Sequence, residues 1–205
     1  LELPIDSLLA TALIYGIKSD TSGFTRNTTS ADWQAIAFLS PIVDMNILHQ
    51  IDTPPRSLET IDIIGRAIRN REIKGSYLVS FVEFINDRDA LPQAADLLLQ
   101  LEGVDTALVF GITEDKIQLS ARSRDSRVNI GMILEKTFGK SAGGHATMAG
   151  GTIDLGIFSD VSDRKALLKV TSDAVKKKFF SSVGIEFEKE ELPDEFSPSN
   201  NKNNK

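Results

Sequence analysis

A change in hydrophobic periodicity at residues 69–75 divides the chain into two parts. Before this segment, apolar residues recur every three or four positions, which predicts helices over 5–16, about 29–39, 43–50 and from 57 onward. After it, runs of β-branched and aromatic residues predict strands over 77–84, 104–112, 116–123 and about 151–158. Helical patterns separate those strands over 89–101, 128–138 and 162–181. We therefore expect an α/β fold class, with a small helical part preceding an α/β domain.

Two local patterns predict where helices of the first part begin. Thr29 with Asp32 three residues later resembles a capping box, in which each residue bonds the backbone of the other. Ser57 is a suitable N-cap for the helix that follows it. The charged segment that ends in Gly-Ser at 75–76 is interpreted as a domain boundary. The expected division is 1–70, 71–190 and a disordered tail at 191–205 that is rich in Asn, Ser and Lys.

Composition excludes several classes of protein. The 205 residues include no cysteine, so disulfides, thiolate zinc sites and a cysteine nucleophile are absent from this chain. The net charge of −6 excludes binding of nucleic acid through the overall charge of the chain. The apolar stretch at 8–17 is too short to span a membrane. We expect a cytoplasmic protein without a membrane partner.

A glycine-rich segment at 139–151 is the strongest candidate for a ligand site, since five of the chain's 14 glycines lie there. Consecutive glycine N–H groups can turn toward an anion, and His145 would add a further donor. The alternative is a tightly packed turn whose histidine bonds a carbonyl group. Arg122 lies on the polar face of the strictly alternating strand at 116–123, and its guanidinium could bind phosphate in a bidentate manner. A solvated surface arginine is the alternative for Arg122.

A second candidate is Asp20, in the segment GIKSDTSGFTR at 16–26. A carboxylate that follows an apolar element and precedes Thr and Gly can bind a hard cation. The same pattern is also typical of an Asx-turn.

Together these segments resemble the DHH phosphoesterases. GIKSDTSGFTR is similar to the fourth motif of that family, and RSR at 122–124 followed by FGKSAGGHATMAGG at 138–151 is similar to the signature of the DHHA1 domain. The resemblance implies a helical remnant of a DHH domain at 1–70 and a DHHA1-type α/β domain with a mixed sheet at 71–190. It implies a manganese-dependent hydrolase that acts on phosphate esters of short oligonucleotides, nucleotide phosphates or cyclic dinucleotides.

The resemblance also assigns roles to individual residues. Asp20 would be a ligand of one of two Mn²⁺ ions, and Arg122, Gly143, Gly144 and His145 would bind the substrate phosphate or the far nucleotide. The expected partner is a phosphate-containing small molecule or a short single-stranded oligonucleotide, with a homodimer as a further option.

The chain departs from the family in its metal ligands. It has only two histidines, His49 and His145, so the adjacent histidines of the Asp-His-His motif are absent, and only 19 residues precede Asp20. A two-metal centre needs several ligands. We therefore expect no catalytic residue and no stably bound metal in this chain, which would mainly supply substrate binding in a longer enzyme. The alternatives are a non-catalytic nucleotide-binding or nucleic-acid-binding module and, less favoured, a regulatory protein with a degenerate site.

Overall fold

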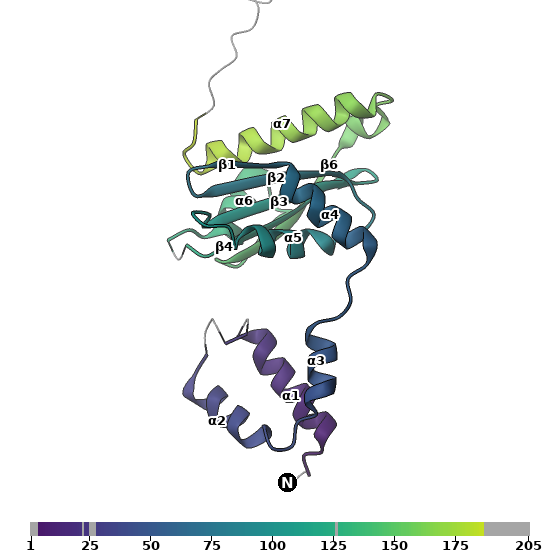
Figure 1. The fold of residues 1–205 in the computed structure, drawn as a ribbon. Coiled ribbons are helices and arrows are strands. Elements are labelled where there is room, and N and C mark those ends of the chain that lie inside the picture. The colour runs from purple at the N-terminus through teal and green to yellow at the C-terminus, as the bar shows by residue number, and fades with distance from the viewer. Residues whose placement is uncertain (1–3, 22, 25–27, 126, 187–205) are drawn as a thin grey trace, which may run out of the picture. The chain divides into compact units, whose positions relative to one another are not determined.

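The computed structural model describes residues 4–21, 23–24, 28–125 and 127–186, which fall into two compact units. The first unit ends at Arg56 and the second begins at Ser57. Figure 1 shows the helical first unit and the second unit with its sheet and helices. The tail predicted to be disordered at 191–205 lies outside the described residues.

The first unit consists of three helices, α1 (Ser7–Asp20), α2 (Ser30–Leu39) and α3 (Met45–Asp52). The capping box predicted for α2 is confirmed. The Thr29 hydroxyl accepts the Asp32 backbone N–H at 3.3 Å, and the Asp32 carboxylate accepts the Thr29 N–H at 2.7 Å. The Thr29 N–H and the Thr29 hydroxyl both donate to the Asp32 carboxylate, and they lower the pKa of Asp32 from its ordinary value because they stabilise the charged form.

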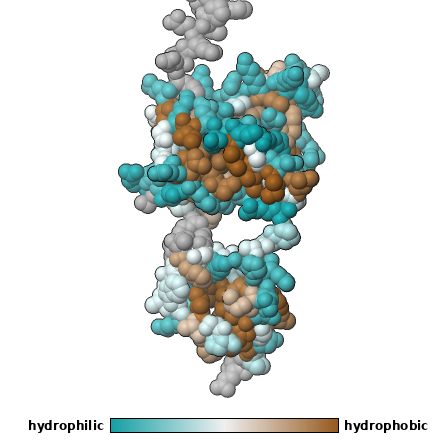
Figure 2. Space-filling model, in the orientation of Figure 1, coloured by the Kyte–Doolittle hydropathy of each residue, from teal (hydrophilic) through white to brown (hydrophobic). Residues whose placement is uncertain are grey.

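The core of this unit is small. Among its described residues, the buried apolar side chains are Ala10, Ile14 and Leu39. Thr11 accepts the Asp44 N–H at 2.9 Å, and Lys18 forms an ion pair with Asp52, so α1 is tied to the region of α3 by polar contacts. Large apolar side chains remain exposed within the described residues of this unit: Leu8, Leu13, Trp33, Phe38, Met45 and Ile51. Figure 2 shows hydrophobic surface on the face of this unit that it displays.

The second unit begins with α4 (Leu58–Arg69), whereas the domain division predicted from the sequence lies at residue 70. Ser57 caps this helix as predicted, since its hydroxyl accepts the Thr60 N–H at 3.0 Å. The apolar face of α4 is buried in one cluster with Leu78 and Val82 of the sheet. An amphipathic pattern shows that a helix buries one face, but it does not show which element covers that face.

The charged segment interpreted as a domain boundary forms a hairpin with the strand that follows it. Strand β1 (Arg71–Lys74) pairs antiparallel with β2 (Tyr77–Phe84), and Gly75 in the turn has a φ of +58°. Positive φ values favour glycine, which explains the Gly-Ser dipeptide. β1 lies at an edge of the sheet, where charged residues discourage pairing with other chains, and its composition therefore resembles that of a linker.

The sheet has six strands in the order β1-β2-β3-β4-β6-β5. The remaining strands are β3 (Thr106–Thr113), β4 (Lys116–Ser123), β5 (Ala142–Gly144) and β6 (Met148–Asp154). β2 and β3 are parallel, whereas every other neighbouring pair is antiparallel. The predicted mixed sheet in an α/β domain is confirmed.

Helices cover both faces of this sheet (Figure 1). α4 and α5 (Ala90–Leu98) pack on the face that carries Leu78, Val82 and Val109. α6 (Ile130–Phe138) and α7 (Arg164–Ser182) pack on the opposite face, and a 3-10 turn, η1 (Gly156–Asp160), precedes α7. The alternation predicted for β4 is confirmed, because Ile117, Leu119 and Ala121 lie in the cluster under α6 and α7. Arg122 consequently belongs to the α5 side. No helix in the described part of the chain is both long and apolar enough to cross a bilayer.

Candidate functional site

A pocket of about 440 Å³ opens in the second unit between the start of α5 and the strands β4, β5 and β6. Three of the four residues predicted to bind substrate line it: Arg122, Gly143 and Gly144. Their assembly requires the antiparallel pairing of β4 with β6 and of β6 with β5, which brings residues 122 and 143 into one site.

The floor of the pocket is formed by small residues. Ser120 of β4 pairs with Gly150 of β6, which in turn pairs with Gly143 of β5. Residues directly opposite in an antiparallel pair share one face of the sheet, so the missing side chain of Gly150 leaves space beside Ser120. A ligand can therefore approach the backbone of the sheet closely.

The wall of the pocket carries Arg122. Its side chain is only 15% exposed, and its Nε donates to Oδ1 of Asp96 on α5 at 2.7 Å. Its Nη1 donates to the Ala121 carbonyl oxygen at 3.1 Å. Arg122 is therefore an ordered, largely buried cation at the edge of a cavity and not a solvated surface arginine.

His145 lies next to the pocket but does not line it. It is exposed and lies in the connection from β5 to β6. Both its backbone N–H and its backbone carbonyl form hydrogen bonds. The His145 N–H donates to the Met148 carbonyl at 2.8 Å, and the His145 carbonyl accepts the Gly131 N–H at 3.1 Å. The Ile130 N–H donates to the Ala146 carbonyl at 3.0 Å. The N–H groups of Ile130 and Gly131, in the first turn of α6, are thus bonded to backbone carbonyls of residues 146 and 145.

The glycine-rich segment is a short strand, a turn and a second strand, whereas its composition predicted a loop. β5 and β6 occupy most of it and pair with each other. Gly144 is required by packing, because a Cβ there would lie 2.6 Å from the Met148 carbonyl oxygen. Alternating patterns predict strands, but glycine and alanine carry no such alternation, and the segment therefore resembled a loop.

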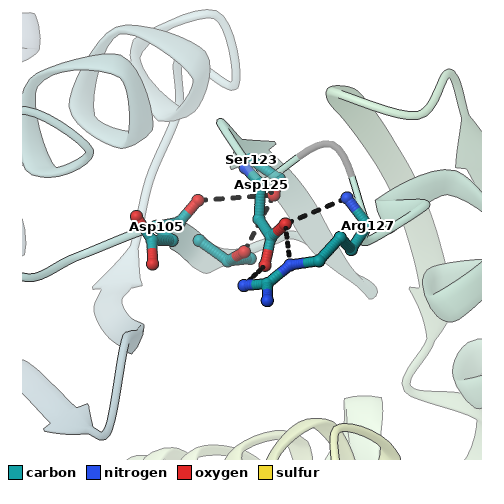
Figure 3. A network of polar contacts seen from close by, with 5 residues as sticks. Asp105, Ser123, Asp125 and Arg127 are labelled. Carbon is teal, nitrogen blue, oxygen red and sulfur yellow. Dashed lines mark hydrogen bonds and ion pairs between the residues drawn. The ribbon is translucent and has the colours of Figure 1, made fainter.

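A polar network fixes the turn that follows Arg122 (Figure 3). Arg127 donates to both carboxylate oxygens of Asp125 at 2.9 Å, and the Asp125 N–H donates to Ser123 Oγ at 3.3 Å. The hydrogen bonds from Arg127 hold the pKa of Asp125 below its ordinary value. Arg127 is paired in this way and does not line the pocket, so it does not join Arg122 there.

Asp20 is the last residue of α1 and belongs to the first unit. The described residues include no group of three or more His, Asp or Glu side chains that could hold a metal ion. His49, at the exposed surface of α3, does not supply the missing ligands. The residues that the structure describes therefore do not fit a two-manganese centre.

Sequence reasoning missed Asp96, the partner of Arg122. A signal for it existed, since Asp96 is the one polar residue in the stretch AADLLL at 94–99. A carboxylate in such a stretch points to a specific cation nearby. Arg88, which also lines the pocket, lies in a charged loop and has no comparable signal.

Comparisons with known proteins agree with this architecture. Residues 74–177 match the DHHA1 domain family. The uncharacterized protein MJ1633 of Methanocaldococcus jannaschii is 46% identical over 181 residues, which are 88% of this chain and 37% of that protein. The cyclic-di-AMP phosphodiesterase PdeA of Listeria monocytogenes is 31% identical over 149 residues, which are 71% of this chain and 22% of that protein. The chain thus spans well under half the length of either relative.

A solved structure shows the same fold. An exopolyphosphatase-related protein from Bacteroides fragilis superimposes with a TM-score of 0.64 at 18% identity. The match covers 87% of this chain and 53% of that protein.

Proposed function

The chain belongs to the DHHA1 domain family, and from that premise we propose that its second unit binds the phosphate group of a nucleotide or of a short single-stranded oligonucleotide. The observation that carries the proposal is the side chain of Arg122, held in place at the edge of a glycine-floored pocket. Gly143, Gly144 and the neighbouring His145 are proposed to contact the same ligand.

Arg122 supplies the electrostatic part of this binding. A guanidinium presents five N–H donors in one plane, and hydrogen bonds from such a cation to phosphate are among the stronger ones in proteins. Because the side chain is only 15% exposed, water screens its charge less than that of a surface arginine. Arg88 lies at the same pocket and could add a second, more weakly held positive charge.

The size of the pocket favours a small ligand. Its volume of about 440 Å³ lies in the range of pockets that bind small molecules and cofactors, roughly 300–1,000 Å³. The chain's net charge of −6 would repel a long polyanion at a distance. A mononucleotide, a dinucleotide or the end of a short strand therefore suits the site better than a long strand does.

Hydrolysis is proposed for the complete DHH–DHHA1 arrangement and not for the described residues by themselves. In a protein that carries the full set of DHH metal motifs, this unit would position a phosphate ester for manganese-dependent hydrolysis. The named activity of the Listeria relative, a phosphodiesterase of a cyclic dinucleotide, supports that reaction class. Asp20 is proposed as one of the metal ligands in that setting.

Binding without turnover is the second candidate function. It is favoured by one observation, the lack of a metal-binding group among the described residues. In this case the chain is a non-catalytic nucleotide-binding module.

The test is a titration of the ¹⁵N-labelled chain with adenosine 5′-monophosphate in EDTA, followed by amide chemical shifts. We expect the largest shifts at residues 118–122 and 143–152. A groove between α6 and α7, lined by Lys136, Lys177 and Lys178, serves as an internal reference for nonspecific anion binding. Shifts confined to that groove would overturn the proposed site.

A further inference from the structure

We propose that Asp96 is a positioning residue, which holds the guanidinium plane of Arg122 in the orientation that receives a phosphate. The inference rests on the proposed phosphate binding and concerns a residue outside the glycine-rich segment. Its basis is the 2.7 Å hydrogen bond between Arg122 Nε and Asp96 Oδ1, which joins β4 to α5.

The hydrogen bonds of Arg122 leave one corner of its guanidinium for a ligand. Asp96 takes the Nε donor, and the Ala121 carbonyl takes an Nη1 donor at 3.1 Å. Ser120 Oγ lies 3.5 Å from the same Nη1. Within the described residues, Nη2 has no acceptor. Hydrogen bonds at two corners restrict the orientation of the group, and Arg122 lines the pocket, so the third corner remains for a ligand.

The backbone of Asp96 is itself fixed. Its neighbours Ala94, Ala95 and Leu98 are almost completely buried in the cluster between α5 and the sheet. The carboxylate projects from a helix that cannot shift without disturbing this packing. Asp96 can therefore act as a rigid support for a long and otherwise flexible side chain.

Stability is not the whole role of the pair. Asp96 compensates the charge of Arg122, which is only 15% exposed, but the carboxylate itself is 58% exposed, so water screens part of the interaction. An ordered arginine does benefit binding, since the ligand need not immobilise it.

The carboxylate has two opposite effects on an incoming phosphate. It orders Arg122, which favours binding, and its negative charge repels the ligand, which disfavours binding. Substitutions can separate the two effects. Asp96→Asn keeps a side-chain oxygen that accepts from Nε but removes the charge, whereas Asp96→Ala removes both.

The experiment measures the affinity of the full chain for adenosine 5′-monophosphate and for inorganic phosphate by isothermal titration. We expect Asp96→Asn to bind at least as tightly as the wild type. We expect Asp96→Ala to bind about two- to tenfold more weakly, because binding must then order a long side chain. Asp173→Ala, an exposed aspartate on α7 at the other face of the sheet, is the matched control and should leave the affinity unchanged.

A spectroscopic readout distinguishes positioning from a structural role. The Nε–H resonance of Arg122 should be resolved in the wild type and in Asp96→Asn, and it should broaden or shift toward the free-arginine position in Asp96→Ala. Asp173→Ala should keep the melting temperature of the wild type within about 2 °C. Asp96→Ala should melt lower, because it leaves the largely buried guanidinium of Arg122 without its carboxylate, and its amide spectrum shows whether it is folded during the titration.

Two failures remain distinguishable. If the wild type binds neither probe, the proposed phosphate site is wrong. If the wild type binds and Arg122→Ala does not, the phosphate site stands. If, in that case, Asp96→Ala binds as tightly as Asp96→Asn, the positioning role of Asp96 is overturned.

Discussion

Gly131 of α6 lies so close to Gly144 of β5 that a Cβ atom on Gly131 would sit 2.3 Å from the Gly144 carbonyl oxygen. The Gly131 N–H also donates to the His145 carbonyl at 3.1 Å. The start of α6 and the connection from β5 to β6 are therefore one packed element. The glycines of this region serve packing as well as access to the pocket.

Gly131→Ala should destabilise the second unit. The added methyl group cannot be accommodated without moving α6 or the backbone at 144–145, and overpacking of this kind costs about 1–3 kcal/mol. Thermal unfolding followed by circular dichroism measures the effect. Gly65→Ala in α4 is the control, since its Cβ would meet only the end of the Arg69 side chain at 3.4 Å. That variant should gain about 0.5–1 kcal/mol from helix propensity. Equal stabilisation by both substitutions would contradict the observed packing.

The Asp125–Arg127 pair should make stability dependent on pH in the acid range. Because the folded-state pKa of Asp125 is lowered, its contribution is present above the unfolded-state pKa of about 3.9 and is lost as the pH falls through the folded-state value. Arg127→Ala should therefore reduce stability slightly at pH 7 and have a smaller effect near pH 2. Urea unfolding at both pH values measures this.

Arg124→Ala provides the matched control for that experiment, because no ion pair of the Arg124 side chain is seen among the described residues. It should show no pH-dependent difference from the wild type. A loss of stability in Arg127→Ala that is as large at pH 2 as at pH 7 would contradict the assigned role of the pair.

The two units should differ in amide hydrogen exchange. The first unit buries only Ala10, Ile14 and Leu39 as a core and leaves Trp33 and Phe38 exposed among its described residues. Opening therefore costs less free energy there than in the sheet. We expect faster exchange in α1–α3 than in β2, β3 and β4. Equal protection would show that another surface, such as a second copy of the chain, covers these apolar side chains.

The chain should not hydrolyse phosphate esters when Mn²⁺ is added. Its two histidines, His49 and His145, are not adjacent, so the Asp-His-His motif is absent from this sequence, and a two-metal centre needs several ligands. The assay compares adenosine bisphosphate and a short oligonucleotide with a metal-free reaction. Turnover that depends on Mn²⁺ and is abolished by Asp20→Ala would contradict this expectation.

The sequence predicted the elements whose patterns are strong. Strand β4 alternates strictly between apolar and polar residues, and its bounds of Lys116–Ser123 match the prediction. The cap of α2 was predictable because Thr29 and Asp32 interact locally. Both features depend on neighbours within a few residues and do not require knowledge of the fold.

The errors have a common physical origin in long-range packing. The helical pattern of α4 does not show that Leu78 and Val82, more than ten residues away, cover it. The charges of β1 reflect its place at the sheet edge, which is set by the strand order. Asp96 could not be paired with Arg122 because the two are joined only when α5 packs beside β4.

The affinity of Arg122→Ala for adenosine 5′-monophosphate tests the central claim most directly. A hydrogen bond to a charged group contributes about 1.5–3 kcal/mol, so loss of this side chain should weaken binding roughly ten- to a hundredfold. Arg124→Ala, at an exposed arginine two residues further along, should bind as the wild type does. Amide spectra confirm that each variant remains folded. A folded Arg122→Ala variant with unchanged affinity would contradict the assignment of this pocket as a phosphate site.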